Sequence, residues 1–289
     1  MKLPEGWQES LIETNGVRLH VVTAGNPGGK PVVLLHGFPE FWYGWRRQIP
    51  ALAAAGYRVI VPDQRGYNLS EVPKGVRAYR SEELVADVLG LLDHFGYERV
   101  RLAGHDWGAA LAWSLAIHHP DRLEKLAILN VPHTDVMWQT IRSSPRQLLK
   151  SWYIGFFQIP GLADGLLRMG NFAGAVRLLR SSGRAGTFSE ADLEEYRQAW
   201  NNSVGLTGMI NWYRAAVRYR SHSSGDRRVR LPVLILWGRR DVALSAGMAQ
   251  GSLELCDDGR LVYFDDATHW VQHNAAQAVN RELIAFFGK

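Results

Sequence analysis

The chain has 289 residues, of which 46% are hydrophobic and 21% charged, with a formal net charge of +5 and one cysteine, Cys256. These proportions are typical of a globular protein, and the length suits one α/β domain that carries an insertion. A lone cysteine excludes an internal disulfide framework, and no apolar run reaches the roughly 20 residues that a membrane span needs. The start, MKLPEGWQES, lacks the apolar stretch of a secretion signal. We therefore expect a cytoplasmic protein, monomeric or homodimeric, with no membrane partner.

The positive charge raises the question of a nucleic-acid partner. Six arginines lie between Arg214 and Arg230, and the later ones flank a loop rich in Ser and Gly. Arginines around such a loop are typical of a solvated surface. We therefore interpret the basic loop 218–230 as solvent-exposed and expect no nucleic-acid partner.

Short β-branched runs alternate with longer helical patterns along the chain, which indicates a mostly parallel sheet covered by helices. We predict strands at Val17–Val22, Val32–His36, Arg58–Val61, Val100–Gly104, Leu123–Leu129, Val233–Trp237 and Arg260–Phe264. The segment GNPGGK, residues 25–30, lacks the Ser or Thr that ends a phosphate-binding loop, and we interpret it as a hairpin-like turn.

The alternation of strands and helices stops after residue 129, and the chain becomes helical and aromatic until the strand at residue 233. We interpret residues 133–225 as a helical cap inserted into a core made of residues 1–132 and 226–289. Ligands of open α/β sheets bind outside the carboxyl ends of the strands. The cap is therefore expected to cover the active site.

The turn GHDWG, residues 104–108, joins a predicted strand to a predicted helix and places Asp106 at its tip. A sharp strand-turn-helix connection with small residues on either side of the tip is typical of a nucleophile elbow. Asp is also a common helix N-cap, where the helix dipole stabilises its charge. An N-cap does not require glycines two residues to either side, so we predict that Asp106 is a nucleophile.

Such a nucleophile needs a histidine that activates water and an acid that orients the histidine. Asp241 and His269 each follow a predicted strand, and the chain order of nucleophile, acid and histidine is that of α/β-hydrolases. We predict these roles for them, with Asp265 or Asp266 as a less favoured acid. Among the other histidines, His105 is expected to point away from Asp106.

A tetrahedral intermediate also needs N–H donors, from the residue after the nucleophile and from the loop after an earlier strand. These positions are Trp107 and Phe38, the latter within HGFPE. HGFPE is also compatible with a tight turn that merely ends a strand. We predict an oxyanion hole at the two backbone amides.

Three motifs resemble those of the epoxide hydrolase family of α/β-hydrolases: the segment that begins HGFPEFWYGW, the turn GHDWG, and THWVQ near the C-terminus. The resemblance covers nearly the whole chain. It implies an α/β-hydrolase fold, with a mostly parallel eight-stranded sheet flanked by helices and an inserted helical cap.

The resemblance also assigns roles to two tyrosines of the cap. The segments WYIGFFQIPG and NWYRA are similar to those that carry the family's lid tyrosines. It places these roles on Tyr153 and Tyr213. Tyr213 is equally compatible with a core position, since Met209 and Ile210 share its apolar helical face. We expect Trp152, with the neighbouring phenylalanines 156 and 157, to shape the pocket.

An aspartate is ionised at neutral pH and can attack a saturated carbon directly, forming an alkyl-enzyme ester. In the function that the resemblance implies, Asp106 opens a small hydrophobic epoxide, the two cap tyrosines activate the oxirane oxygen, and water activated by His269 and Asp241 hydrolyses the ester to a vicinal diol. No cofactor and no metal are expected.

Two alternatives remain open from the sequence. A haloalkane or haloacid dehalogenase would use the same triad, but such enzymes typically have Asn after the HG dipeptide, where this chain has Phe38. A ligand-binding homologue without catalysis would have a broken triad.

Overall fold

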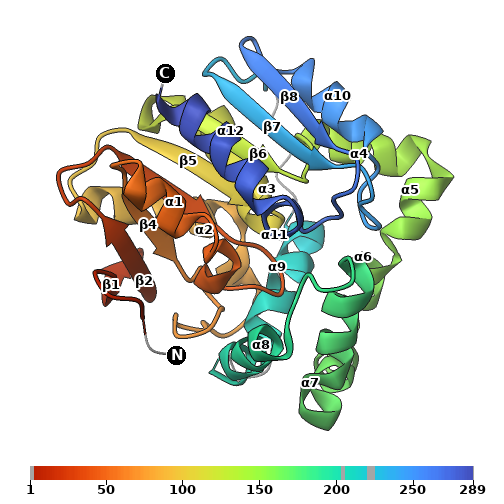
Figure 1. Ribbon diagram of the computed structural model, residues 1–289. Helices are drawn as coiled ribbons and strands as arrows, with labels where there is room; N and C mark the ends of the chain where they lie inside the picture. The colour runs from red at the N-terminus through yellow and green to blue at the C-terminus, as the bar shows by residue number, and fades with distance from the viewer. Residues whose placement is uncertain (1–2, 203–205, 220–224, 289) are drawn as a thin grey trace.

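The computed structural model describes residues 3–202, 206–219 and 225–288 (Figure 1). Within these ranges eight strands form one sheet in the order β1-β2-β4-β3-β5-β6-β7-β8. Their bounds are β1 Gln8–Thr14, β2 Val17–Gly25, β3 Pro31–Leu35, β4 Arg58–Pro62, β5 Val100–His105, β6 Leu123–Leu129, β7 Val233–Gly238 and β8 Gly259–Phe264. The pairs from β4 through β8 are parallel, and β2 pairs antiparallel with both β1 and β4. The expected fold, a mostly parallel eight-stranded sheet, is confirmed.

At the β1 side of the sheet one strand was not predicted and one local prediction was wrong. The edge strand β1 was not predicted, because only Ile12 and Thr14 of its seven residues are buried and the strand lacks a continuous apolar run. The segment 25–30 is not a hairpin turn, since β4 lies between β2 and β3 in the sheet. The chain therefore leaves β2 and crosses to a strand that is not its neighbour.

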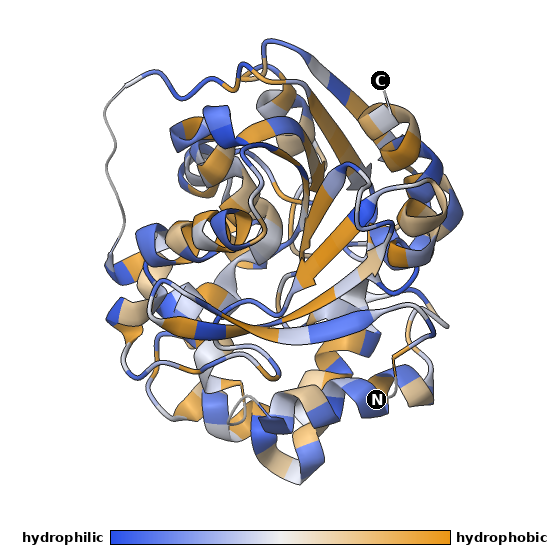
Figure 2. Ribbon diagram, turned by 90° about the vertical axis from the view of Figure 1, so that its left-hand side faces the viewer, coloured by the Kyte–Doolittle hydropathy of each residue, from blue (hydrophilic) through white to orange (hydrophobic). Residues whose placement is uncertain are grey.

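The central strands are apolar on both faces because helices cover both faces of the sheet. Residues 32–35 of β3 and residues 233–238 of β7 are entirely buried, and the central strands are coloured hydrophobic in Figure 2. Helices α1 and α12 pack together in front of the sheet in Figure 1, while α2 and α3 pack against each other. The core helices are α1 Ile49–Ala54, α2 Ser81–His94, α3 Trp107–His118, α10 Gly247–Leu253, α11 Val271–Asn274 and α12 Ala276–Gly288, with the 3-10 turns η1 Trp42–Trp45, η2 Val76–Tyr79 and η3 Pro120–Arg122.

Between β6 and β7 the described chain forms helices instead of strands, and we call them the inserted helices. They are α4 Thr134–Ser143, α5 Pro145–Lys150, α6 Trp152–Phe156, α7 Leu162–Ser182, α8 Glu190–Asn202 and α9 Thr207–Arg218. Residues 169–172 have non-helical dihedral angles, so α7 consists of two helical pieces joined by a turn. No helix of the described ranges is long and apolar enough to cross a membrane.

The junction between β5 and α3 is closely packed at its two glycines. A Cβ atom at Gly108 would lie 2.1 Å from the carbonyl oxygen of Leu35, and one at Gly104 would lie 2.4 Å from the carbonyl oxygen of Gly108. Because these neighbours are backbone atoms, they cannot move aside by changing a rotamer. The glycines of the GHDWG turn thus allow α3 to start directly against β3.

We expect Gly108→Ala to lower the free energy of unfolding by about 1–3 kcal/mol, the usual cost of overpacking. The matched control is Gly165→Ala in α7, where a Cβ atom would meet nothing within 4 Å. Removing the flexibility of a helical glycine should stabilise that control by about 0.5–1 kcal/mol. Urea denaturation measures both variants, and equal stability of Gly108→Ala and the parent would contradict the packing argument.

Candidate active site

Asp106 lies on the tight turn between β5 and α3. Its backbone has a φ of 51° and a ψ of −123°, a left-handed conformation that costs a non-glycine residue on the order of 1–3 kcal/mol. The side chain makes no capping hydrogen bond to α3. The N-cap interpretation is therefore wrong, and the carboxylate is directed elsewhere.

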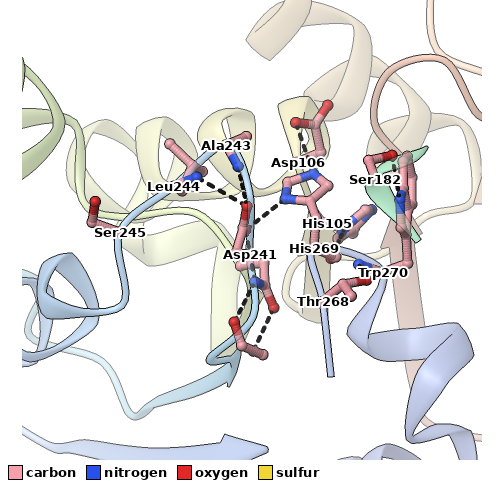
Figure 3. Close-up of polar contacts among 12 residues, drawn as sticks. His105, Asp106, Ser182, Asp241, Ala243, Leu244, Ser245, Thr268, His269 and Trp270 are labelled. Carbon is pink, nitrogen blue, oxygen red and sulfur yellow. Dashed lines mark hydrogen bonds and ion pairs between the residues drawn. The ribbon is translucent and has the colours of Figure 1, made fainter. Parts of the chain in front are cut away.

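The Asp106 carboxylate points toward His269, which in turn contacts Asp241 (Figure 3). His269 Nε2 lies 3.3 Å from Asp106 Oδ2, and His269 Nδ1 lies 2.8 Å from Asp241 Oδ2. The backbone N–H groups of Ala243 and Leu244 donate to Asp241 Oδ1 over 2.7 and 2.9 Å. The acid is thus held from one side while it orients the histidine from the other.

The charges of Asp106, His269 and Asp241 strongly affect one another. Burial disfavours the charged form of His269, but the carboxylates of Asp241 and Asp106 outweigh burial and raise the pKa of His269 to about 10. Burial alone would raise the pKa of Asp106 and of Asp241, yet the contacts with His269 hold both below their ordinary value. At neutral pH the site therefore contains an imidazolium between two carboxylates.

The loop after β3 approaches the same carboxylate. The Phe38 N–H donates to Asp106 Oδ1 over 2.7 Å, and a Cβ atom at Gly37 would lie 2.2 Å from the Cβ of Asp106. Trp107 is the first residue of α3, so its N–H has no acceptor within the helix. The two predicted oxyanion-hole residues thus flank the Asp106 carboxylate.

Both predicted cap tyrosines face this carboxylate across a cavity. The cavity has a volume of about 260 Å³ and is lined by Asp106, Trp107, Tyr153 and Tyr213 among others. The ring centroids of the tyrosines are 5.9 Å apart. Burial and the charge of Asp106 raise the pKa of Tyr153 and of Tyr213. Both hydroxyls are therefore protonated at neutral pH and able to donate.

Sequence reasoning missed Asn130, which directly follows β6 and has a φ of 52°. Its Nδ2 donates to Asp241 Oδ2 over 2.8 Å, and its Oδ1 accepts from the Gly238 N–H over 2.8 Å. Asn130 therefore ties the acid to the end of β7. The signal was present, because Asn130 occupies a strand end like the other site residues.

A second buried polar cluster, also missed, surrounds Glu40. Its carboxylate accepts from the Tyr196 hydroxyl over 2.5 Å, from Gln272 Nε2 over 2.9 Å, and from His273 Nε2 at 2.8 Å. Burial lowers the pKa of His273 to about 4, which keeps that ring neutral. His105 points away from Asp106, as expected, and its Nε2 lies 2.9 Å from the His269 carbonyl oxygen. The cluster joins α8 to α11, the short helix that begins two residues after His269.

Other sequence-based expectations have mixed outcomes. Trp152 is 67% exposed and does not line the cavity, so the expectation that it shapes the pocket is wrong. Phe156 and Phe157 do not line the cavity either, although Phe157 packs against the rings of Tyr153 and Tyr213. Asp265 and Asp266 pair with exposed arginines and do not reach His269. In the basic loop, residues 220–224 lie outside the described residues, while Arg227 is bonded to Asp135 and reaches the cavity wall.

Asp106, Asn130, Asp241, His269 and Phe38 all follow the carboxyl ends of neighbouring parallel strands, which is the arrangement of an α/β-hydrolase active site. A family described as having the alpha/beta hydrolase fold matches residues 30–276. The AB hydrolase superfamily protein YfhM of Bacillus subtilis (strain 168) is 42% identical over 98% of both chains.

The comparisons also include proteins with a named activity. Epoxide hydrolase A of Mycobacterium tuberculosis is 36% identical over 96% of both chains. A crystal structure of the Bacillus megaterium epoxide hydrolase in complex with an inhibitor is 30% identical, with a TM-score of 0.90, and matches 97% of this chain and 100% of that one. The chain therefore belongs to the epoxide hydrolase family of α/β-hydrolases.

The geometry makes a prediction about the charge of His269. Replacing Asp106 with Asn removes one of the two carboxylates that favour the imidazolium, so the pKa of His269 should fall from about 10 by about 1–3 pH units. Titration of the imidazole NMR signals, assigned by their loss in His269→Gln, measures the change. The exposed Asp121→Asn is the matched control and should leave the titration unchanged. An unaltered pKa in Asp106→Asn would contradict the coupling.

Proposed function

We propose that the protein hydrolyses an epoxide to a vicinal diol through a covalent ester on Asp106. The observation that carries this proposal is the position of the Asp106 carboxylate between His269 and a cavity lined by Tyr153 and Tyr213. The named activities of the relatives support the same substrate class. We also propose that residues 133–225 act as a cap over a core of residues 1–132 and 226–289.

In the first step an oxygen of the Asp106 carboxylate attacks an oxirane carbon, a C–O bond forms to the enzyme, and the oxirane C–O bond breaks. The leaving oxygen is an alkoxide, which is far more basic than a phenol of pKa about 10. A tyrosine hydroxyl therefore donates first a hydrogen bond and then its proton. The tyrosinate recovers a proton as His269 loses its own.

The change of charge on Asp106 prepares the second step. Once Asp106 is an ester, it no longer stabilises the imidazolium, so the pKa of His269 falls and the neutral ring becomes a base. His269 then takes a proton from water, the oxygen of which attacks the ester carbonyl. The Phe38 and Trp107 amides stabilise the oxyanion. The ester C–O bond then breaks, and the leaving alkoxide takes the remaining proton of the attacking water to become the second hydroxyl of the diol. Asp106 is left as a carboxylate and His269 as an imidazolium, so one water is consumed for each epoxide.

Replacing His269 with Gln should stop the second step and leave the first, since Asp106 remains. Turnover should fall by about 10²- to 10⁴-fold, the usual contribution of a general base. Intact mass spectrometry after addition of a terminal epoxide should show an adduct with the mass of one whole substrate. The same measurement on Asp106→Asn/His269→Gln is the control and should show no adduct. No adduct on His269→Gln, together with no diol from the parent enzyme, would contradict the proposal.

Replacing both Tyr153 and Tyr213 with Phe removes the proton donors for the alkoxide while keeping the aromatic packing. Epoxide turnover should fall by about 10²-fold or more, as measured by diol formation. Tyr97→Phe, whose ring stacks on Phe95 and does not line the cavity, is the matched control and should leave turnover unchanged. Full epoxide activity of the double variant would refute the tyrosine roles. Halide release from a haloalkane, without diol from any epoxide, would identify a dehalogenase instead.

A further inference from the structure

Large apolar side chains are exposed on one segment of the inserted helices. In the described part of the chain, thirteen large hydrophobic residues are exposed, and eight of them lie between residues 148 and 178. They are Leu148, Leu149, Trp152, Ile159, Leu162, Leu166, Met169 and Leu178. Single exposed apolar residues are normal on a protein surface, but such a concentration marks an interaction site. We call these eight residues the apolar patch.

The patch belongs to helices that follow one another along one side of the molecule. In Figure 1, α5, α6 and α7 extend down the side opposite strands β1 and β2. Leu162 and Leu166 are four residues apart on the first piece of α7, so they share one face of that helix, and Met169 begins the turn that follows it. The exposed Trp152 and Leu149 lie on the adjoining short helices.

The same helices carry much of the basic charge of the chain. Helices α5, α6 and α7 contain five Arg and Lys residues and one acid, Asp164, which gives a net charge of +4, against +5 for the whole chain. Asp164 is itself bonded to Arg214 of α9, and Arg180 pairs with Glu190 of α8. The basic residues are Arg146, Lys150, Arg168, Arg177 and Arg180.

We propose that α5, α6 and α7 bind the surface of an anionic lipid bilayer. Leu and Trp side chains that enter the interface, together with basic residues that contact lipid phosphates, are the combination that holds amphipathic helices on such surfaces. No helix needs to cross the bilayer for this contact. The expectation of no membrane partner rested on the lack of a continuous apolar run, which surface binding does not require.

Charge argues against a second copy of the chain as the occupant of the patch. A symmetric dimer would place two such surfaces face to face, each with the same excess of basic residues. Like charges at an interface oppose association. A nucleic acid would satisfy the basic residues but would leave the exposed Leu and Met side chains in water.

Membrane binding would bring the candidate active site close to a lipid phase. Trp152 directly precedes Tyr153, which lines the cavity. Hydrophobic epoxides concentrate in lipid, so the contact would place the protein where such a substrate is dissolved. The binding itself does not depend on the proposed reaction and is tested without a substrate.

The test uses the full chain, sedimented with vesicles of phosphatidylcholine alone or of phosphatidylcholine mixed with phosphatidylglycerol. We expect binding to the mixed vesicles that weakens as salt is added, and little binding to the neutral ones. The triple variant Leu149→Ser, Trp152→Ser, Leu166→Ser should bind about tenfold more weakly or worse, because it removes apolar contacts with lipid.

Two further variants separate the contributions. The control Leu11→Ser/Leu69→Ser removes exposed apolar residues outside the patch and should bind like the parent. Replacing Arg146, Arg168 or Arg177 with Gln should weaken binding roughly fivefold for each charge removed. Thermal melting of every variant shows whether the fold is retained.

Three results would overturn the proposal. The first is an absence of binding to the anionic vesicles at low salt, and the second is equal binding by the triple variant and the parent. The third is occupation of the patch by another partner while vesicles are not bound. A dimer in sedimentation velocity that the triple variant abolishes would identify a second copy, and salt-dependent retention on DNA would identify a nucleic acid.

Discussion

The arrangement of the site depends on one buried cation between the buried carboxylate of Asp241 and the carboxylate of Asp106, which lines the cavity. Isolated charges are costly to bury, and here each one has a partner. The Asp241 carboxylate has no exposed surface, and it is compensated by His269, by Asn130 and by two backbone N–H groups. Among the described residues, the Asp106 carboxylate is compensated by His269 and by the Phe38 N–H. Neutralising Asp106 therefore removes one of the two carboxylates that favour the charged form of His269.

Much of the fold and of the candidate site followed from local sequence patterns. Alternating strand and helix patterns predicted a parallel sheet, and the carboxyl ends of parallel strands converge on one edge. That convergence is why Asp106, Asp241 and His269, far apart in the chain, were predicted to meet. The turn at residues 104–108 was recognisable because tight backbone packing requires glycine at fixed positions. Each of these predictions depended on a single element and the position of its end.

Features that depend on contacts between distant elements were not predictable in this way. Glu40 is bonded to Tyr196, which is 156 residues away, and to His273, which is 233 residues away. No local pattern indicates such a cluster. Trp152 was assigned to the pocket with its neighbour Tyr153, but successive residues of a helix with 3.6 residues per turn point about 100° apart. With Tyr153 facing the cavity, Trp152 faces water, and only the packed structure reveals the exposed surface that results.

At residue 106, which has a left-handed backbone, the position of the side chain and the reaction that it supports are determined by different features. The turn fixes where the Asp106 carboxylate lies, because φ and ψ of this residue are set by the glycine-packed junction of β5 and α3. The side chain at the tip determines which electrophile is attacked, while the histidine and the oxyanion donors are those that any acyl ester requires. In the proposed reaction the enzyme thus forms an ester on its own Asp106 carboxylate and then hydrolyses that ester. A fold built for hydrolysing carbonyl compounds would in this way gain access to saturated carbon by changing one residue at the tip of one turn.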